Sequence, residues 1–319
     1  MGLLQNGQWV DQWYETDDNG GEFKRQDSRF RNWLTANGEA GPNGEQGFKA
    51  EKGRYHLYVS LACPWAHRTL VFRKLKQLED YIDVTVVDPV MLENGWEVKD
   101  PLYGFDFVYQ LYLKADPSYE GRVTVPALWD KQTETIVSNE SADIIRMFNT
   151  AFNHLTGNND DYYPQALRDK IDTLNDRVYE NINNGVYRAG FATTQQAYET
   201  AFFELFDTLD WVESILAKQR YLAGDQLTEA DWRLFTTLIR FDAVYFGHFK
   251  TNRQRLADYP AISDYVRELY QVPGIAETVS IEHIKTHYYA SHPTINPTGI
   301  IPVGPSQDFT VPHNRAEFG

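Results

Sequence analysis

The order of predicted strands and helices in the first half of the chain is the feature that most limits its fold. Residues 54–60 (RYHLYVS) alternate polar and apolar side chains as a strand does. Residues 68–78 (RTLVFRKLKQL) place apolar side chains at helical spacing, and residues 82–88 (IDVTVVD) form a second strand pattern. A strand, a helix and a strand in close succession predict a βαβ unit.

A second set of elements follows a long connection, residues 89–121, which is rich in aromatic side chains and contains Gly and Pro. Residues 123–130 (VTVPALWD) and 135–138 (TIVS) are typical of two strands close in sequence. Residues 139–152 then follow with a helical pattern. The order β-α-β and then β-β-α is that of an α/β thioredoxin-like domain, which we predict over residues 52–155.

The rest of the chain has a different character. Helical patterns without comparable strands predict an all-helical domain over residues 165–290. The predicted helices cover residues 165–183, 195–219, 228–247, 260–271 and 275–286. Thr228 and Asp231 have the spacing of a capping box at one helix start. We expect residues 1–51 to pack on the body as an extension, and the Pro- and Gly-rich tail, residues 291–319, to lie on the surface.

Composition narrows the function classes. A length of 319 residues favours two domains, and 42% apolar with 24% charged residues is typical of a globular protein. The formal net charge of −15 repels phosphate backbones and disfavours nucleic acid as a partner. No apolar run is long enough for a membrane span, and the first residues lack a signal-peptide pattern. We therefore expect no membrane partner and a cytoplasmic location.

Cys63 is the only cysteine of the chain, which excludes an internal disulfide or a dithiol pair. It lies between the end of a predicted strand and the start of a helix, with Pro64 at the favoured first helical position. The helix N-terminus favours a thiolate, and His67 and Arg68 can add positive charge nearby. The alternative is a small buried apolar side chain. A reactive Cys63 needs a thiol from another molecule to complete its cycle.

Two further features surround this cysteine in the predicted fold. Pro126 interrupts an apolar run, and one explanation is a cis Val125–Pro126 bond that presents the Val125 backbone to an extended peptide ligand. The alternative is an ordinary edge-strand proline. The turn at residues 138–141 opens a helix, so its amides can bind a carboxylate while Glu140 binds an ammonium group. Capping by Ser138 or Asn139 is the alternative there.

The three predicted features are a Cys63 thiolate, a Val125 backbone that can pair with a peptide, and a turn at residues 138–141 that can bind an amino-acid zwitterion. Together they match one small ligand. Glutathione is a thiol peptide with a free α-amino and α-carboxylate end. It also supplies the second thiol that the cysteine count requires. We therefore expect glutathione as a co-substrate, and no metal. His283 and His287 have helical i, i+4 spacing, with His292 beyond, but the intervening residues lack the glutamate of a zinc protease motif.

The chain also resembles a known family. The segments LACPWAHR, ENGWEV, GRVTVPALWD, SNESADIIRMFN and RFDAVYFGHF are similar to those of the xi-class glutathione transferases, also described as glutathionyl-hydroquinone reductases. The similarity extends from about residue 25 to 300 and includes the extension and the tail. It implies the glutathione transferase architecture, with a thioredoxin-like N-terminal domain and an all-α C-terminal domain, and a homodimer.

The resemblance also implies roles for individual residues. Cys63 is the nucleophile, and Tyr187 resembles the tyrosine that donates a proton. The implied glutathione-binding set is Trp96, Arg122, Val125, Glu140 and Ser141. Tyr245 and Tyr288 are implied members of an aromatic substrate pocket. The residues alone do not single out these three among 20 tyrosines.

The implied activity is the glutathione-dependent reduction of glutathionyl-hydroquinones to hydroquinones. Cys63 takes the glutathione as a mixed disulfide, and a second glutathione releases it as glutathione disulfide. One alternative is a transferase that conjugates glutathione to electrophiles, although that chemistry prefers a Ser or Tyr hydroxyl beside the thiol. Another is a non-catalytic module that binds glutathione or aromatic ligands, which has no use for a thiolate.

Overall fold

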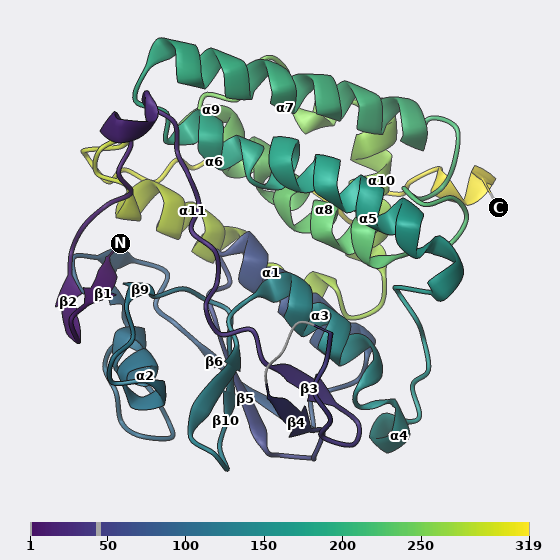
Figure 1. Ribbon diagram of the computed structural model, residues 1–319. Helices are drawn as coiled ribbons and strands as arrows, with labels where there is room; N and C mark the ends of the chain where they lie inside the picture. Colours follow the sequence, from purple (N-terminus) through teal and green to yellow (C-terminus); the bar gives the residue numbers. More distant parts are fainter. Residues whose placement is uncertain (1, 43–45, 319) are drawn as a thin grey trace. The chain divides into compact units, whose positions relative to one another are not determined.

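The computed structural model describes residues 2–42 and 46–318, and the chain in it forms two compact units. Each unit gathers segments that are distant in the sequence. The first contains the residues up to Trp13, Gln26–Asp161 and Thr278–Ser291. The second contains Tyr14–Arg25, Tyr162–Glu277 and the residues from His292 onward. The units are therefore interleaved along the chain, whose course the colours of Figure 1 follow.

A four-stranded mixed sheet is the centre of the first unit (Figure 1). Its strands, in spatial order, are β11 (Thr135–Ser138), β10 (Ala127–Asp130), β5 (Tyr55–Val59) and β6 (Ile82–Val86). Strand β10 is antiparallel to both neighbours, whereas β5 and β6 are parallel. All five residues of β5 are buried, as expected for a central strand that is covered on both faces.

Helices complete the thioredoxin-like order of this unit. Helix α1 (Pro64–Leu75) connects β5 to β6, and α3 (Ser141–Thr150) follows β11 and packs against α1. The unit also contains α2 (Val108–Ala115), α4 (Asn153–Thr156) and α11 (Ile281–Ser291). The succession β5-α1-β6 and then β10-β11-α3 confirms the predicted fold class for this part of the chain.

Two local predictions for this unit were wrong. The strand expected over residues 123–130 begins only at Ala127, since Pro126 has no amide hydrogen to donate to a ladder. The segment 89–121 was expected to be a connection, but it contains regular elements. Its strands are only two residues long, which is too short for a recognisable sequence pattern. These elements are β7 (Met91–Leu92), β8 (Gly95–Trp96), α2 and β9 (Gly121–Arg122).

The N-terminal extension contributes its residues up to Trp13 and from Gln26 onward to this unit. Strands β1 (Leu3–Gln5) and β2 (Gln8–Val10) form a sheet with β9, in the order β2-β1-β9. Leu4 is fully buried and lies opposite Gly121. Strands β3 (Trp33–Thr35) and β4 (Gly47–Lys49) form a short parallel pair. Residues 43–45 lie outside the described residues.

The second unit is built from helices. The α-helices are α5 (Arg168–Val178), α6 (Gly185–Gly190), α7 (Gln195–Leu216), α8 (Glu229–Arg240), α9 (Phe246–His248) and α10 (Pro260–Gln271). π-Helical turns occur at η3 (Tyr179–Asn183) and η4 (Phe241–Tyr245), and 3₁₀ turns at η1 (Asp17–Asn19), η2 (Gln165–Leu167), η5 (Leu256–Asp258), η6 (Ala276–Thr278, which ends in the first unit) and η7 (Arg315–Phe318). The helix predicted over 228–247 is thus interrupted by η4.

The start of α8 confirms the predicted capping box. The Thr228 amide donates a hydrogen bond to the Asp231 carboxylate at 2.8 Å, and both side chains are fully buried. Burial raises the pKa of Asp231, even though amides and the Tyr265 hydroxyl donate to it. In the described part of the chain, no helix is long and apolar enough to cross a membrane.

Candidate functional site

Cys63 occupies the predicted position between β5 and α1. It is the N-cap residue of α1, with extended backbone angles, and Pro64 follows within the first turn. The thiol is partly exposed and is not in a disulfide. The helix N-terminus presents amides and the positive end of the helix dipole, and this environment favours the thiolate form that attacks sulfur.

Val125 lies directly beside this cysteine. The Cys63 Sγ atom is 3.4 Å from the Val125 carbonyl oxygen, and the Val125–Pro126 peptide bond is cis, as predicted. Among the described residues, the Val125 amide donates to no acceptor. The neighbouring Thr124 carbonyl accepts a hydrogen bond from the Tyr112 hydroxyl at 2.7 Å, which fixes this segment. An extended peptide therefore has an available backbone partner next to the sulfur.

The turn before α3 contains the predicted Glu140 and Ser141. Glu140 is itself the N-cap of α3, where its carboxylate accepts from the Ala142 amide at 3.0 Å. The second carboxylate oxygen accepts from the Ser28 hydroxyl at 3.1 Å, so the N-terminal extension reaches this turn.

Two basic side chains lie at the same helix start. The buried Arg68 of α1 donates to the Ser141 hydroxyl at 3.4 Å, and its guanidinium lies 4.6 Å from the centre of the Trp65 ring. Arg31 forms an ion pair with the buried Asp143. Positive charge at a helix N-terminus suits a ligand with a carboxylate.

His67 differs from the expected role of supplying charge near Cys63. Its side chain is fully buried, and Nε2 lies 2.8 Å from the Thr278 hydroxyl within the same unit. The imidazole thus links α1 to the segment that leads into α11. Arg122, which the resemblance implies as a glutathione ligand, donates to the carbonyls of Gln12 and Trp13. The Arg122 guanidinium therefore links the N-terminal extension to β9.

Trp96 of β8 is buried and stacks on His287 of α11, with ring centres 4.8 Å apart and an interplanar angle of 24°. The Nδ1 atom of His287 lies 2.9 Å from the Pro89 carbonyl oxygen. These contacts give His287 a packing role. Within the residues the structure describes, no group of three or more His, Cys, Asp or Glu side chains could hold a metal ion.

The three predicted tyrosines fall in different units. Tyr288 is buried in α11 of the first unit. Tyr187 of α6 and Tyr245 of η4 belong to the second unit, and their ring centres lie 6.1 Å apart. Tyr245 is fully buried, whereas Tyr187 is partly exposed.

Arg25 contacts Tyr187, and the sequence did not predict this contact. Its guanidinium lies 4.8 Å from the centre of the Tyr187 ring and donates to the Asn184 side chain at 3.1 Å. The available signal was the basic stretch 25–31 in an otherwise acidic extension.

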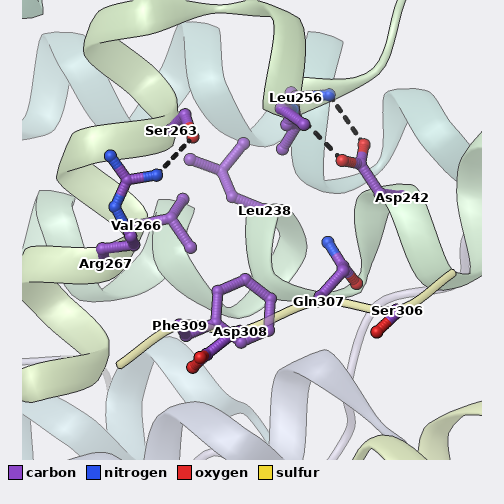
Figure 2. A pocket seen from close by; sticks show the side chains of 11 residues that line it. Leu238, Asp242, Leu256, Ser263, Val266, Arg267, Ser306, Gln307, Asp308 and Phe309 are labelled. Atoms are coloured by element: carbon purple, nitrogen blue, oxygen red, sulfur yellow. Dashed lines mark hydrogen bonds between the residues drawn. The ribbon is translucent and has the colours of Figure 1, made fainter. Parts of the chain in front are cut away.

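The second unit also contains a cavity of about 200 Å³ (Figure 2). Leu238, Leu256 and Val266 line it, and the tail segment 306–309 crosses it. Its polar side chains bond within the unit: Asp242 accepts from the Leu256 amide at 2.7 Å, and Arg267 donates to Ser263 at 3.0 Å. Because none of these residues was predicted to act on substrate, we assign this cavity no part in the site.

Comparison with known proteins defines the class first. Residues 62–151 match the glutathione S-transferase N-terminal domain model, and residues 195–268 match the C-terminal domain model. A thioredoxin-like unit followed by a helical unit is thus the architecture of a glutathione transferase. This confirms the predicted architecture.

Full-length relatives define the family. The chain is 60% identical to the glutathionyl-hydroquinone reductase YqjG of Escherichia coli K12, covering 100% of both chains. It is 53% identical to the glutathionyl-hydroquinone reductase PcpF of Sphingobium chlorophenolicum, covering 96% and 97%. The chain belongs to the glutathionyl-hydroquinone reductase family of xi-class glutathione transferases.

Solved structures agree with this placement. The glutathione-bound structure of YqjG, described as a glutathione transferase homolog, matches with a TM-score of 0.88 and 61% identity, covering 90% of this chain and 96% of that one. A xi-class glutathione transferase of Natrialba magadii matches with a TM-score of 0.92 and 48% identity, covering 99% and 98%.

Proposed function

We propose that this protein uses glutathione to reduce glutathionyl-hydroquinones to hydroquinones. The observation that carries the proposal is the position of Cys63, at the N-cap of α1 and 3.4 Å from the Val125 carbonyl oxygen. A nucleophilic sulfur stands there beside a backbone segment that can pair with a peptide. The names of the relatives, two glutathionyl-hydroquinone reductases, support the choice of substrate.

The first half-reaction forms a mixed disulfide. The Cys63 thiolate attacks the sulfur of glutathione that is bound to a ring carbon of the hydroquinone. The carbon–sulfur bond breaks, and its electron pair stays on the ring carbon, which must take a proton to become C–H. We propose Tyr187 as the proton donor, because a phenol can deliver a proton to a departing carbanion or stabilise its keto form. The two sulfur atoms are oxidised, and the ring carbon is reduced.

The second half-reaction restores the enzyme. A glutathione thiolate attacks the glutathione sulfur of the mixed disulfide, which yields glutathione disulfide and the Cys63 thiolate. Trp96, Arg122, Val125, Glu140 and Ser141 are the proposed glutathione ligands, and Tyr245 and Tyr288 are proposed to line the hydroquinone pocket. The cycle consumes reduced glutathione, which the cytosol maintains, so we propose a cytoplasmic location. A homodimer, with glutathione and glutathionyl-hydroquinones as the small-molecule partners, completes the proposal.

Intact-mass spectrometry tests this proposal directly. The protein is mixed with a glutathionyl-hydroquinone, first without and then with glutathione. We expect one glutathione adduct and one released hydroquinone per chain in the first step, and turnover only in the second. A protein that instead conjugates glutathione to an electrophile, or that binds glutathionyl-hydroquinone without cleaving it, would contradict the proposal. Sedimentation measurements test the dimer separately.

A further inference from the structure

Two buried histidines in the second unit form a hydrogen-bonded pair. His248 ends α9, and His292 is the residue at which the chain re-enters this unit. The Nε2 atom of His248 lies 3.0 Å from the Nδ1 atom of His292. Their ring centres are 5.3 Å apart, and the side chains are only 5% and 3% exposed. The pair joins two segments that are 44 positions apart in the sequence.

Phe249 connects this pair to the tyrosines. Its ring is fully buried and lies 6.1 Å from the His292 ring at an interplanar angle of 23°. The same ring stacks on Tyr245, at 5.5 Å and 18°, and meets Tyr187 edge-on at 5.6 Å. Phe249 therefore contacts both the histidine pair and the two tyrosines.

The packing around Phe249 leaves little freedom. A Cβ atom added to Gly190, at the end of α6, would lie 2.2 Å from the Phe249 ring. Helix α6, which carries Tyr187, thus approaches this ring at a distance that only glycine permits. A displacement of Phe249 must therefore move the Tyr187 ring, the Tyr245 ring or both.

His248 is neutral at physiological pH, because burial, with a smaller contribution from the charge of Lys250, lowers its pKa to about 4. His248 and His292 share one N···N hydrogen bond, in which one ring donates and the other accepts. In a site from which water is excluded, such a bond fixes both ring planes, because breaking it leaves a buried polar group unsatisfied.

We propose that the His248–His292 pair is a positioning element, which holds Phe249 and thereby orients Tyr187 and Tyr245 for proton delivery to the substrate. The inference rests on the proposed function, since it concerns the tyrosines of that reaction. Displacements on the order of 1 Å cost up to ~10²-fold in a positioned reaction. The pair acts on thioether cleavage, which needs the proton, and not on the exchange between two sulfur atoms, which does not.

The test separates the two half-reactions. Single-turnover cleavage of a glutathionyl-hydroquinone is measured by stopped-flow, and reduction of the preformed Cys63–glutathione disulfide by glutathione is measured independently. We expect His292→Phe, which keeps a ring but loses the hydrogen bond, to slow cleavage roughly 10- to 100-fold and leave disulfide reduction unchanged. His292→Asn, whose side-chain oxygen can replace Nδ1, should restore cleavage to within about 3-fold.

The control is His56→Gln. His56 is likewise buried, and its Nε2 atom lies 2.7 Å from the Thr85 hydroxyl, but it belongs to β5 of the first unit. We expect this variant to keep both rates. His248→Leu provides an independent second variant should His292→Phe not fold, and it must show the same selective loss. The double variant, His248→Leu with His292→Phe, should slow cleavage no more than either single variant does, because both substitutions remove the same hydrogen bond.

The outcomes distinguish the inference from the function. Equal slowing of both half-reactions, or an unchanged cleavage rate in both truncated variants, would overturn the positioning role. Failure of His292→Asn to recover cleavage would overturn it as well. If the unmodified protein does not cleave the thioether at all, the proposed function itself is wrong.

Discussion

The Sγ atom of Cys63 lies 3.4 Å from the carbonyl oxygen of Val125, although the two residues are 62 positions apart. The contact brings the N-terminus of α1 together with the segment that precedes β10. We propose that a peptide which pairs with the Val125 backbone places its middle residue next to the sulfur. In glutathione that middle residue is cysteine, so this pairing would bring the two sulfur atoms together for exchange.

The first prediction concerns this sulfur. Cys63→Ser replaces the thiolate by a hydroxyl that cannot form a disulfide, so we expect turnover to fall at least ~10³-fold. Glutathione should still bind, because its backbone contacts do not depend on the sulfur, and calorimetry can measure that affinity. Activity within a few-fold of the original protein would exclude the covalent mechanism.

The second prediction concerns Tyr187. Tyr187→Phe removes the proposed proton donor, and we expect single-turnover thioether cleavage to slow by about 10²- to 10⁴-fold. The affinity for glutathione should change little. Tyr163→Phe is the matched control, since that hydroxyl donates to Asp172 at 2.7 Å within the helical unit. Should Tyr187→Phe weaken glutathione binding as much as it slows cleavage, Tyr187 would be a binding residue.

The third prediction concerns the stability of the helical unit. Arg315 is 2% exposed and donates to the carbonyls of Leu216, Gln219 and Arg220 at 2.5–2.6 Å, at the end of α7. Arg315→Ala leaves these carbonyls unsatisfied, so we expect the free energy of unfolding to fall by about 3 kcal/mol.

Urea titration followed by circular dichroism measures this change. Arg255→Ala serves as the comparison, because Arg255 pairs with Asp258 on the exposed surface. Such exposed pairs contribute little, so we expect a much smaller loss from this variant than from Arg315→Ala. Equal losses for the two arginines would show that the α7 cap does not stabilise the unit.

The fourth prediction concerns pH. Burial lowers the pKa of His56 to about 4, whereas an unfolded chain has a histidine pKa of about 6.5. As the pH falls, His56 is therefore protonated in the unfolded state at a higher pH than in the folded state. The stability that His56 contributes is present above pH 6.5 and is lost between pH 6.5 and 4, by an amount on the order of 2–3 kcal/mol.

Denaturation at several pH values measures this slope. His56→Gln removes the titrating group, so the free energy of unfolding should fall less steeply below pH 6.5 than in the unmodified protein. His154→Gln changes an exposed histidine on α4, and it should leave the slope unaltered. A slope that is unchanged in His56→Gln would assign the pH dependence to other groups.

Features set by neighbouring residues could be predicted from the sequence. The N-cap position of Cys63 follows from Pro64 and the preceding strand, and the capping box of α8 follows from the spacing of Thr228 and Asp231. The limits of β5 and β11 fell within one residue of prediction, since both have clear alternating or apolar patterns.

Features that depend on distant residues could not be predicted. Strands β7 and β8 have two residues each, and β1 exists because it pairs with β9 more than a hundred residues later. Likewise, the placement of α11 with the first unit has no signature in its own amphipathic pattern. The tyrosines illustrate the same limit, because a residue type that also fills cores carries no local mark of reactivity.

The cap on α7 has a consequence for synthesis of the chain. Arg315 is 95 to 99 positions beyond the carbonyls that it binds. A ribosome must therefore translate past codon 315 before the longest helix of this unit obtains its last hydrogen bonds. A product that ends before Arg315 therefore lacks these hydrogen bonds at the C-terminal end of α7.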